Sequence, residues 1–173
     1  MVLQRQATFV CGHLSTSEDA AVAHAVPPAT LRVGGEVARE QLLTLAGLRA
    51  LPSVTLTVPD RGCAPSSTTH ACTGVLLRDV LQHAGVFDDA TRNNDVCGKF
   101  VTIVARDGYC ITLAYCDLLI PYSQQRALLA YMVDDISLGD AELILPDDPN
   151  ACRWVKHVAE IMLGDPRSLR STA

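Results

Sequence analysis

The segment 59–72 holds the side chains with the greatest chemical reactivity in this chain. Cys63 follows Arg61 by two positions, within a run of small polar residues. A nearby cation lowers the pKa of a thiol and favours the thiolate, the form that attacks electrophiles and binds metals. His70 and Cys72 lie further along, and with Cys63 they could hold zinc, although the Cys-x-x-Cys spacing typical of zinc sites is absent from the sequence. Cys63 is therefore a candidate metal ligand or reactive thiol, with a thiol of no special role as the alternative. His70 could contact a ligand or simply pack in the loop.

A second group of candidates surrounds an Asp-Gly turn. Arg106, Asp107 and Tyr109 lie at this turn, between two runs of alternating apolar residues. Turn geometry alone explains an aspartate, and core packing explains a tyrosine with its hydroxyl at the edge. Because loops often carry binding residues, ligand contact is the other interpretation. Arg153 precedes the only tryptophan, Trp154, and its guanidinium suits a phosphate, unless it is a solvated strand residue.

Composition narrows the classes of function. The chain has 173 residues, a formal charge of −5 and 49% apolar residues, which predicts one folded domain without the basic stripe of a nucleic-acid-binding surface. It has no apolar run long enough to span a membrane and no evident signal peptide. We expect a soluble cytoplasmic protein, or an exported one whose signal peptide has been removed. The seven cysteines are interpreted mostly as reduced thiols, with one structural disulfide left open, and Cys110 as a small buried hydrophobe.

Hydrophobic patterns predict mainly β-structure. Strands are expected at 31–33, 54–58, 99–105, 109–114, 128–133, 142–145 and 154–163, and short helices at 45–51, 75–84 and 115–119. The helix pattern at 154–163 is equally good, and segment 59–72 reads as a long polar loop. The prediction is an α+β fold with a curved or barrel-like mixed sheet and short connecting helices. Residues 1–28 are expected to form an N-terminal arm or edge element, 29–165 the domain and 166–173 a flexible tail.

The order of several short motifs resembles a known family. From Leu31 to Leu163 the chain is similar to the oxidoreductase molybdopterin-binding domain, which has the sulfite oxidase fold. The matching pieces are the strand and turn LRVGGEV, the helix end LRALP, the strand Val54–Val58, the run TGVLLRDVL from Thr73, and then DGY, LAY and Arg153-Trp154. The resemblance implies the fold, favours a strand at 154–163, and implies a molybdopterin or another pterin as cofactor.

The chain departs from the family pattern at three places. The position of the molybdenum-ligating cysteine of active members aligns with Val58, which cannot bind a metal, and Cys63 lies five residues later. Asp135 replaces the usual glycine after the strand containing Tyr131, and Glu142 replaces an arginine that would bind an anion. The lysine of the late Lys-Trp pair is replaced by Arg153, which keeps one cation suited to phosphate.

These observations leave three hypotheses open. The first is a pterin- or molybdopterin-binding protein without full redox catalysis, with Arg61, Cys63, His70, Arg106, Asp107, Tyr109 and Arg153 as the candidate binding residues. The second is a molybdenum-dependent oxidoreductase that uses Cys63 as its metal ligand. The third is a protein-interaction module with a degenerate pocket. The expected partner is a small pterin-like molecule, and neither nucleic acid nor membrane is expected. A homodimer or a redox or signalling partner stays open.

Overall fold

The computed structural model describes residues 30–60, 68–86, 88, 91, 94–119, 122–123, 125–149 and 151–168. The described strands form two sheets rather than one, and neither closes into a barrel. The larger sheet has the order β2-β1-β9-β5-β6, and the smaller one has the order β3-β4-β7-β8. Only β1 and β9 pair in parallel, so the expected mixed, mainly β architecture is confirmed. The expected N-terminal arm, 1–28, lies outside the described residues.

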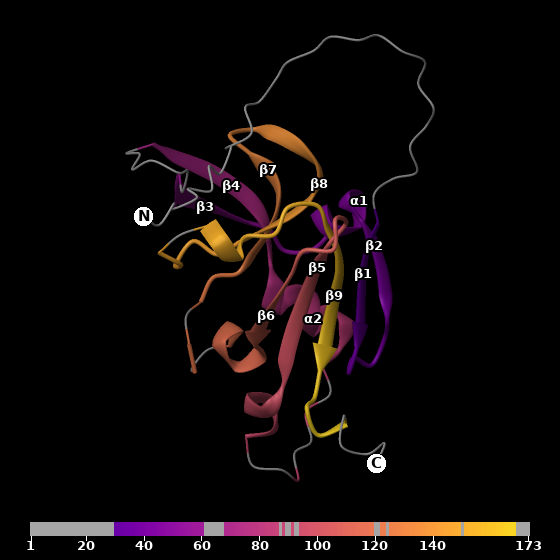
Figure 1. Cartoon of the computed structure of the whole chain (residues 1–173). Helices are drawn as coiled ribbons and strands as arrows, with labels where there is room; N and C mark the ends of the chain where they lie inside the picture. Colours follow the sequence, from indigo (N-terminus) through magenta and orange to yellow (C-terminus); the bar gives the residue numbers. More distant parts are fainter. Residues whose placement is uncertain are drawn as a thin grey trace, which may run out of the picture.

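The larger sheet consists of β1 (Thr30–Gly35), β2 (Gln41–Thr44), β5 (Phe100–Ala105), β6 (Cys110–Ala114) and β9 (Val158–Gly164). The smaller sheet consists of β3 (Val54–Pro59), β4 (Thr69–Leu76), β7 (Leu128–Val133) and β8 (Ile136–Ile144). Two α-helices, α1 (Leu45–Arg49) and α2 (Leu77–Ala84), and three 3₁₀ turns, η1 (Asp95–Gly98), η2 (Tyr115–Leu118) and η3 (Ala151–Arg153), connect them. Figure 1 shows β5, β9 and β1 running side by side.

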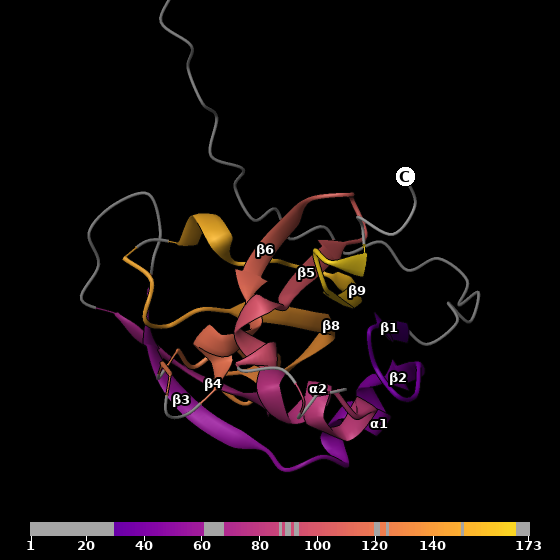
Figure 2. The same ribbon diagram turned by 90° about the horizontal axis from the view of Figure 1, so that it is seen from below.

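One core joins the two sheets and α2. Leu81 of α2, Ile103 of β5 and Leu143 of β8 are each fully buried in the same hydrophobic cluster. Figure 2 shows α2 between the five-stranded sheet and the long arc of β3 and β4. A smaller cluster around Val58 and Leu128 lies within the four-stranded sheet. Burial of these apolar side chains is the main force that holds the layers together.

Local sequence signals explain several elements. Thr44 caps α1 as expected, because its hydroxyl accepts a hydrogen bond from the Gly47 amide at 3.1 Å. Gly85 ends α2 in the left-handed conformation, with φ of 78°. Asp134 and Asp135, with φ of 47° and 63°, form the tight turn between β7 and β8. Asp135 thus adopts the backbone conformation that favours the glycine of the family pattern.

Several predicted boundaries were wrong: β8 begins at Ile136 rather than at 142, and β9 begins at Val158 rather than at 154. Residues 69–72 belong to β4 rather than to a loop, and the helix predicted at 75–84 begins at Leu77 because Val75 and Leu76 are still in β4. The strand forms there because its residues pair with β3 on one side and with β7 on the other, and a register shift between Thr73 and Gly74 accompanies the burial of both Cys72 and Val75. The Thr55 and Thr73 hydroxyls, 2.8 Å apart, link β3 to β4 on the exposed face.

Two further details differ from expectation. The strand and turn expected over LRVGGEV form β1, which ends at Gly35, and the partner strand of the hairpin, β2, was not predicted and begins at Gln41. Cys110 is exposed rather than buried, since Ile111 and Leu113 occupy the inward positions of β6. The period-two alternation of a strand puts neighbouring side chains on opposite faces.

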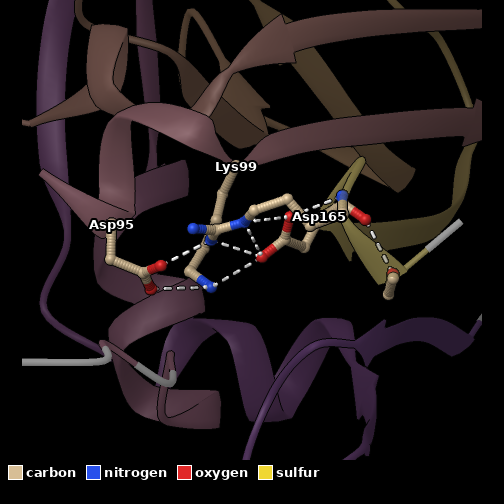
Figure 3. A network of polar contacts seen from close by, with 5 residues as sticks. Asp95, Lys99 and Asp165 are labelled. Atoms are coloured by element: carbon tan, nitrogen blue, oxygen red, sulfur yellow. Dashed lines mark hydrogen bonds and ion pairs between the residues drawn. The ribbon is translucent and has the colours of Figure 1, made fainter. Parts of the chain in front are cut away.

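A buried network of ion pairs joins the end of β9 to the start of β5 (Figure 3). The Lys99 ammonium lies 3.1 Å from the Asp95 carboxylate and 3.8 Å from that of Asp165, and the exposed fractions of the three side chains are 2%, 1% and 9%. Arg167, which falls within the segment predicted as a tail, contacts both carboxylates. Its guanidinium holds the pKa of Asp165 at about 2. The network compensates the charge of two carboxylates buried beneath the sheet.

Candidate functional site

A cleft of about 920 Å³ lies at one edge of the four-stranded sheet. We call it the large cleft. Residues that follow the ends of three different strands meet there: Arg78 after β4, Asp117 after β6 and Asp147 after β8. The remaining lining residues are Val54, Leu56, Leu76, Ser123, Gln125, Arg126 and Asp148. The cleft therefore combines an apolar wall from β3 and β4 with charged groups from the loops.

The charged groups of the large cleft are arranged in pairs. Arg126 binds Asp147 with Nη2 2.7 Å from Oδ1, and its backbone amide donates to Oδ2 of the same carboxylate at 3.0 Å. The side-chain hydrogen bond from Arg126 lowers the pKa of Asp147, so this group is ionised at neutral pH. Arg153 binds Asp148 through Nε at 2.8 Å and Nη2 at 2.5 Å. Both carboxylates are thus held in fixed orientations.

The net charge of the large cleft is close to neutral. Three aspartates and two arginines line it, and Arg153 adds a third cation behind Asp148. Arg126 keeps 53% of its side chain exposed although it is paired with Asp147. Its guanidinium has five N–H donors, more than the pair consumes, so it can also bind an anion from solvent. The cleft can therefore offer both carboxylate acceptors and guanidinium donors to one ligand.

A smaller hollow of about 310 Å³ is lined by residues from the end of β5, the turn after it and η3. Its lining includes the predicted candidates Asp107 and Tyr109, together with Trp154 and Lys156. The Tyr109 hydroxyl donates to the carbonyl oxygen of Cys152, and the Trp154 indole donates to the carbonyl of Leu145 at 3.1 Å. Because the aromatic polar atoms are already engaged, this hollow offers a ligand mainly ring faces, the Lys156 ammonium group and the Asp107 carboxylate, which also accepts a hydrogen bond from the Tyr109 amide.

The structure separates the predicted site residues. Arg153 lies at the large cleft through its pair with Asp148, and Asp107 and Tyr109 line the smaller hollow. His70 and Arg106 line neither of the two hollows. Arg61 and Cys63 lie outside the described residues, so their placement next to Arg153 stays a prediction.

The two remaining candidates are engaged in ion pairs elsewhere. The His70 ring lies 2.6 Å from the carboxylate of Asp134, and that hydrogen bond raises the pKa of His70. Arg106 binds Asp140 with contacts of 3.0 and 3.2 Å and also donates to the carbonyl of Thr30 at 3.3 Å. The first pair ties the start of β4 to the β7–β8 turn and the second ties the β5–β6 turn to the middle of β8, which is a structural role for each side chain.

Sequence reasoning missed most of the large cleft. Arg78, Asp117, Gln125, Arg126, Asp147 and Asp148 were not among the predicted residues. The available signal was the position of Asp117 and Asp147 just beyond a predicted strand, whereas Arg78 lay inside the predicted helix 75–84 and carried no such signal. Such positions converge only once the sheet order is known, and the sequence does not provide that order.

The described residues near the expected position of the metal-ligating cysteine offer no thiolate. Val58, with which the family resemblance aligns that cysteine, is 1% exposed and packs in the smaller core cluster. The nearby Cys72 is 3% exposed, and burial raises its pKa, so it is a protonated thiol. No group of three His, Cys, Asp or Glu side chains within the described part of the chain could hold a metal ion.

Comparison with solved structures supports the architecture. The chain is similar to the sulfane dehydrogenase SoxCD from Paracoccus pantotrophus, with a TM-score of 0.59 and 18% sequence identity. The similarity covers 79% of this chain but only 38% of the SoxCD chain, so the protein spans well under half of that structure. At this level of identity the likeness establishes the fold.

Comparison with family models identifies the class. Residues 22–169 match the oxidoreductase molybdopterin binding domain, and the chain belongs to that family. No curated protein matches the sequence. None of the helices in the described ranges is long and apolar enough to cross a membrane.

Proposed function

We propose that the protein binds a pterin or molybdopterin in the large cleft and does not carry out the full redox reaction of molybdenum enzymes. The observation behind this proposal is the pairing of arginines with aspartates along an apolar wall in a cleft of about 920 Å³. Such a volume accommodates a drug-sized or cofactor-sized molecule. Membership of the family supports the choice of pterin as the ligand class.

The chemistry of the cleft fits a pterin. A pterin is flat, and one edge carries N–H groups that can donate hydrogen bonds to a carboxylate. We assign the role of acceptor to Asp147 and Asp148. Leu56, Leu76 and Val54 provide apolar side chains for the ring faces. Arg126 and Arg78 are suited to the phosphate of a molybdopterin, because guanidinium groups bind phosphate oxygens in pairs.

The residues at the metal position argue for binding without molybdenum redox chemistry. A bound molybdenum cofactor would supply oxygen-atom and two-electron transfer, and its protein ligand in active relatives is a thiolate. Val58 has no donor atom, and the Cys72 thiol is buried and protonated. We therefore assign the chain the role of a pterin-binding protein that holds its ligand through polar side chains rather than through a metal–sulfur bond.

The affinity test uses a fluorescent anionic pterin, 6-carboxypterin, titrated with the full chain. We expect saturable binding that weakens at least about tenfold in Arg126→Gln, since one charge-assisted hydrogen bond is worth more than about 1.4 kcal/mol. Arg106→Gln is the matched control, because Arg106 is also a paired, exposed arginine but lies outside the large cleft. Equal affinities of wild type, Arg126→Gln and Arg106→Gln would argue against this site.

The redox part of the proposal is tested by elemental analysis. Protein from a host that makes molybdenum cofactor is analysed for molybdenum, and its denatured supernatant for pterin fluorescence. We expect pterin without stoichiometric molybdenum. Stoichiometric molybdenum that disappears in Cys63→Ala would instead support the oxidoreductase hypothesis. Absence of both pterin and metal, with no binding of 6-carboxypterin, would leave the protein-interaction module.

A further inference from the structure

Two cysteines lie together beyond the open end of the β5–β6 hairpin. Phe100 at the start of β5 pairs with Ala114 at the end of β6, and the Tyr115 amide donates to the carbonyl of Lys99 at 3.0 Å. The chain therefore continues side by side past the hairpin, into η1 before β5 and η2 after β6. These two turns pack against each other and are adjacent in Figure 1. They bring Cys97 and Cys116 together.

The two thiols are neighbours on these packed turns. Cys97 lies close enough to help raise the pKa of the Cys116 thiol, and neither cysteine is in a disulfide. Cys97 is exposed, whereas Cys116 is partly buried. Burial, the neighbouring Cys97 and the Asp117 carboxylate all raise the pKa of Cys116. An external reagent would thus reach Cys97 first, and Cys116 is placed to act second.

We propose that Cys97 and Cys116 form a redox-sensitive pair that closes to an intramolecular disulfide by exchange with a small disulfide such as oxidised glutathione. The Cys97 thiolate attacks one sulfur of the small disulfide, forms a mixed disulfide and releases one small thiolate. Cys116 then loses its proton and attacks the Cys97 sulfur, and the second small thiolate leaves. Two protein thiols are oxidised, and one small disulfide is reduced to two small thiols. This inference is independent of the proposed ligand.

A disulfide between Cys97 and Cys116 would link η1 covalently to η2. η1 also carries Asp95 of the buried ion network, and η2 carries Asp117 of the large cleft. A bond between the turns constrains the chain from 97 to 116 in the unfolded state and so favours the folded state. We therefore expect the oxidised protein to melt several degrees above the reduced one.

The test is peptide mapping of full-length protein equilibrated with oxidised glutathione, alkylated and digested with trypsin. The peptide 93–99 contains Cys97, and the peptide 107–126 contains both Cys110 and Cys116. The Cys110→Ser variant makes the assignment unambiguous and serves as the control, because Cys110 is an exposed thiol elsewhere on β6. We expect wild type and Cys110→Ser to give the linked pair 93–99 with 107–126, about 2 Da lighter than the two reduced peptides together.

The single variants separate the two steps. Cys116→Ser should accumulate the mixed disulfide on Cys97, and Cys97→Ser should give no linked peptide with 93–99. The gain in melting temperature should be present in Cys110→Ser and absent from both of these variants. The proposal is overturned if Cys110→Ser yields no linked pair, whether Cys97 then carries glutathione, pairs with a different cysteine or stays reduced.

Discussion

Replacing Lys99 with methionine tests how much the buried ion network contributes to the stability of the fold. Methionine keeps an unbranched apolar stem but removes the ammonium that lies 3.1 Å from Asp95 and 3.8 Å from Asp165. Both carboxylates then stay buried, with exposed side-chain fractions of 1% and 9%. Removing one partner of a buried ion pair lowers the unfolding free energy far more than replacing the whole pair with apolar side chains does.

The expected cost is about 3 kcal/mol of unfolding free energy. Removing one partner of a buried ion pair typically costs about 3–5 kcal/mol. We take the lower end because Arg167 remains bound to both carboxylates, with Nε 2.8 Å from Asp165 Oδ1. The penalty should shrink at acid pH, because a protonated carboxyl no longer needs a cation.

Urea denaturation at neutral pH measures this cost. The matched control is Arg32→Met, which removes a cation from a pair with Glu40 at 3.0 Å whose side chains are 41% and 57% exposed. Exposed pairs of this kind contribute at most about 1 kcal/mol. A loss of less than about 1 kcal/mol in Lys99→Met, no larger than that of Arg32→Met, would refute the assignment of a buried, charge-compensated network.

Three other changes test the fold. The pKa of Asp165 is lowered to about 2, so it stabilises the protein above pH ~4 and loses this effect as the pH falls towards 2. Acid titration should cost wild type about 2 kcal/mol more than Asp165→Asn over that interval. Gly74→Ala should lower the unfolding free energy measured in urea by about 2–3 kcal/mol, since the added Cβ would meet the Leu129 carbonyl oxygen at 2.1 Å. Gly34→Ala should lower it less, because the added Cβ there would meet only flexible side-chain atoms. Thr44→Ala should lower the unfolding free energy by about 1 kcal/mol through loss of the cap on α1, and an unchanged urea midpoint would contradict that role.

Local patterns were sufficient for most strands and for the turns between them. The Asp107-Gly108 turn and the alternation of Ile111 and Leu113 predicted the β5–β6 hairpin, because both signals lie within a few residues. The short helix predicted at 45–51 is present as α1, because its signals are also local. The local sequence predicts a turn or a helix correctly when neighbouring residues alone determine that element.

The sequence pattern gave wrong predictions where pairing between distant segments determines the structure. Residues 69–72 were predicted as the end of a polar loop, and they belong to β4 because that strand pairs with β3 on one side and β7 on the other. The large cleft was missed for the same reason. Asp147 and Asp148 resemble an ordinary turn after Pro146 until Arg126 and Arg153 are brought against them. Such encounters depend on sheet order, which separated segments determine jointly.

Amide chemical-shift mapping of the full chain with 6-carboxypterin tests the central claim most directly. If the ligand binds in the large cleft, the shifts should concentrate at Leu56, Leu76, Arg78, Gln125 and Asp147, from four separate segments. Shifts concentrated instead at Asp107, Tyr109 and Lys156 would move the site to the smaller hollow, and the absence of any saturable shift would contradict the proposal that this protein binds a pterin.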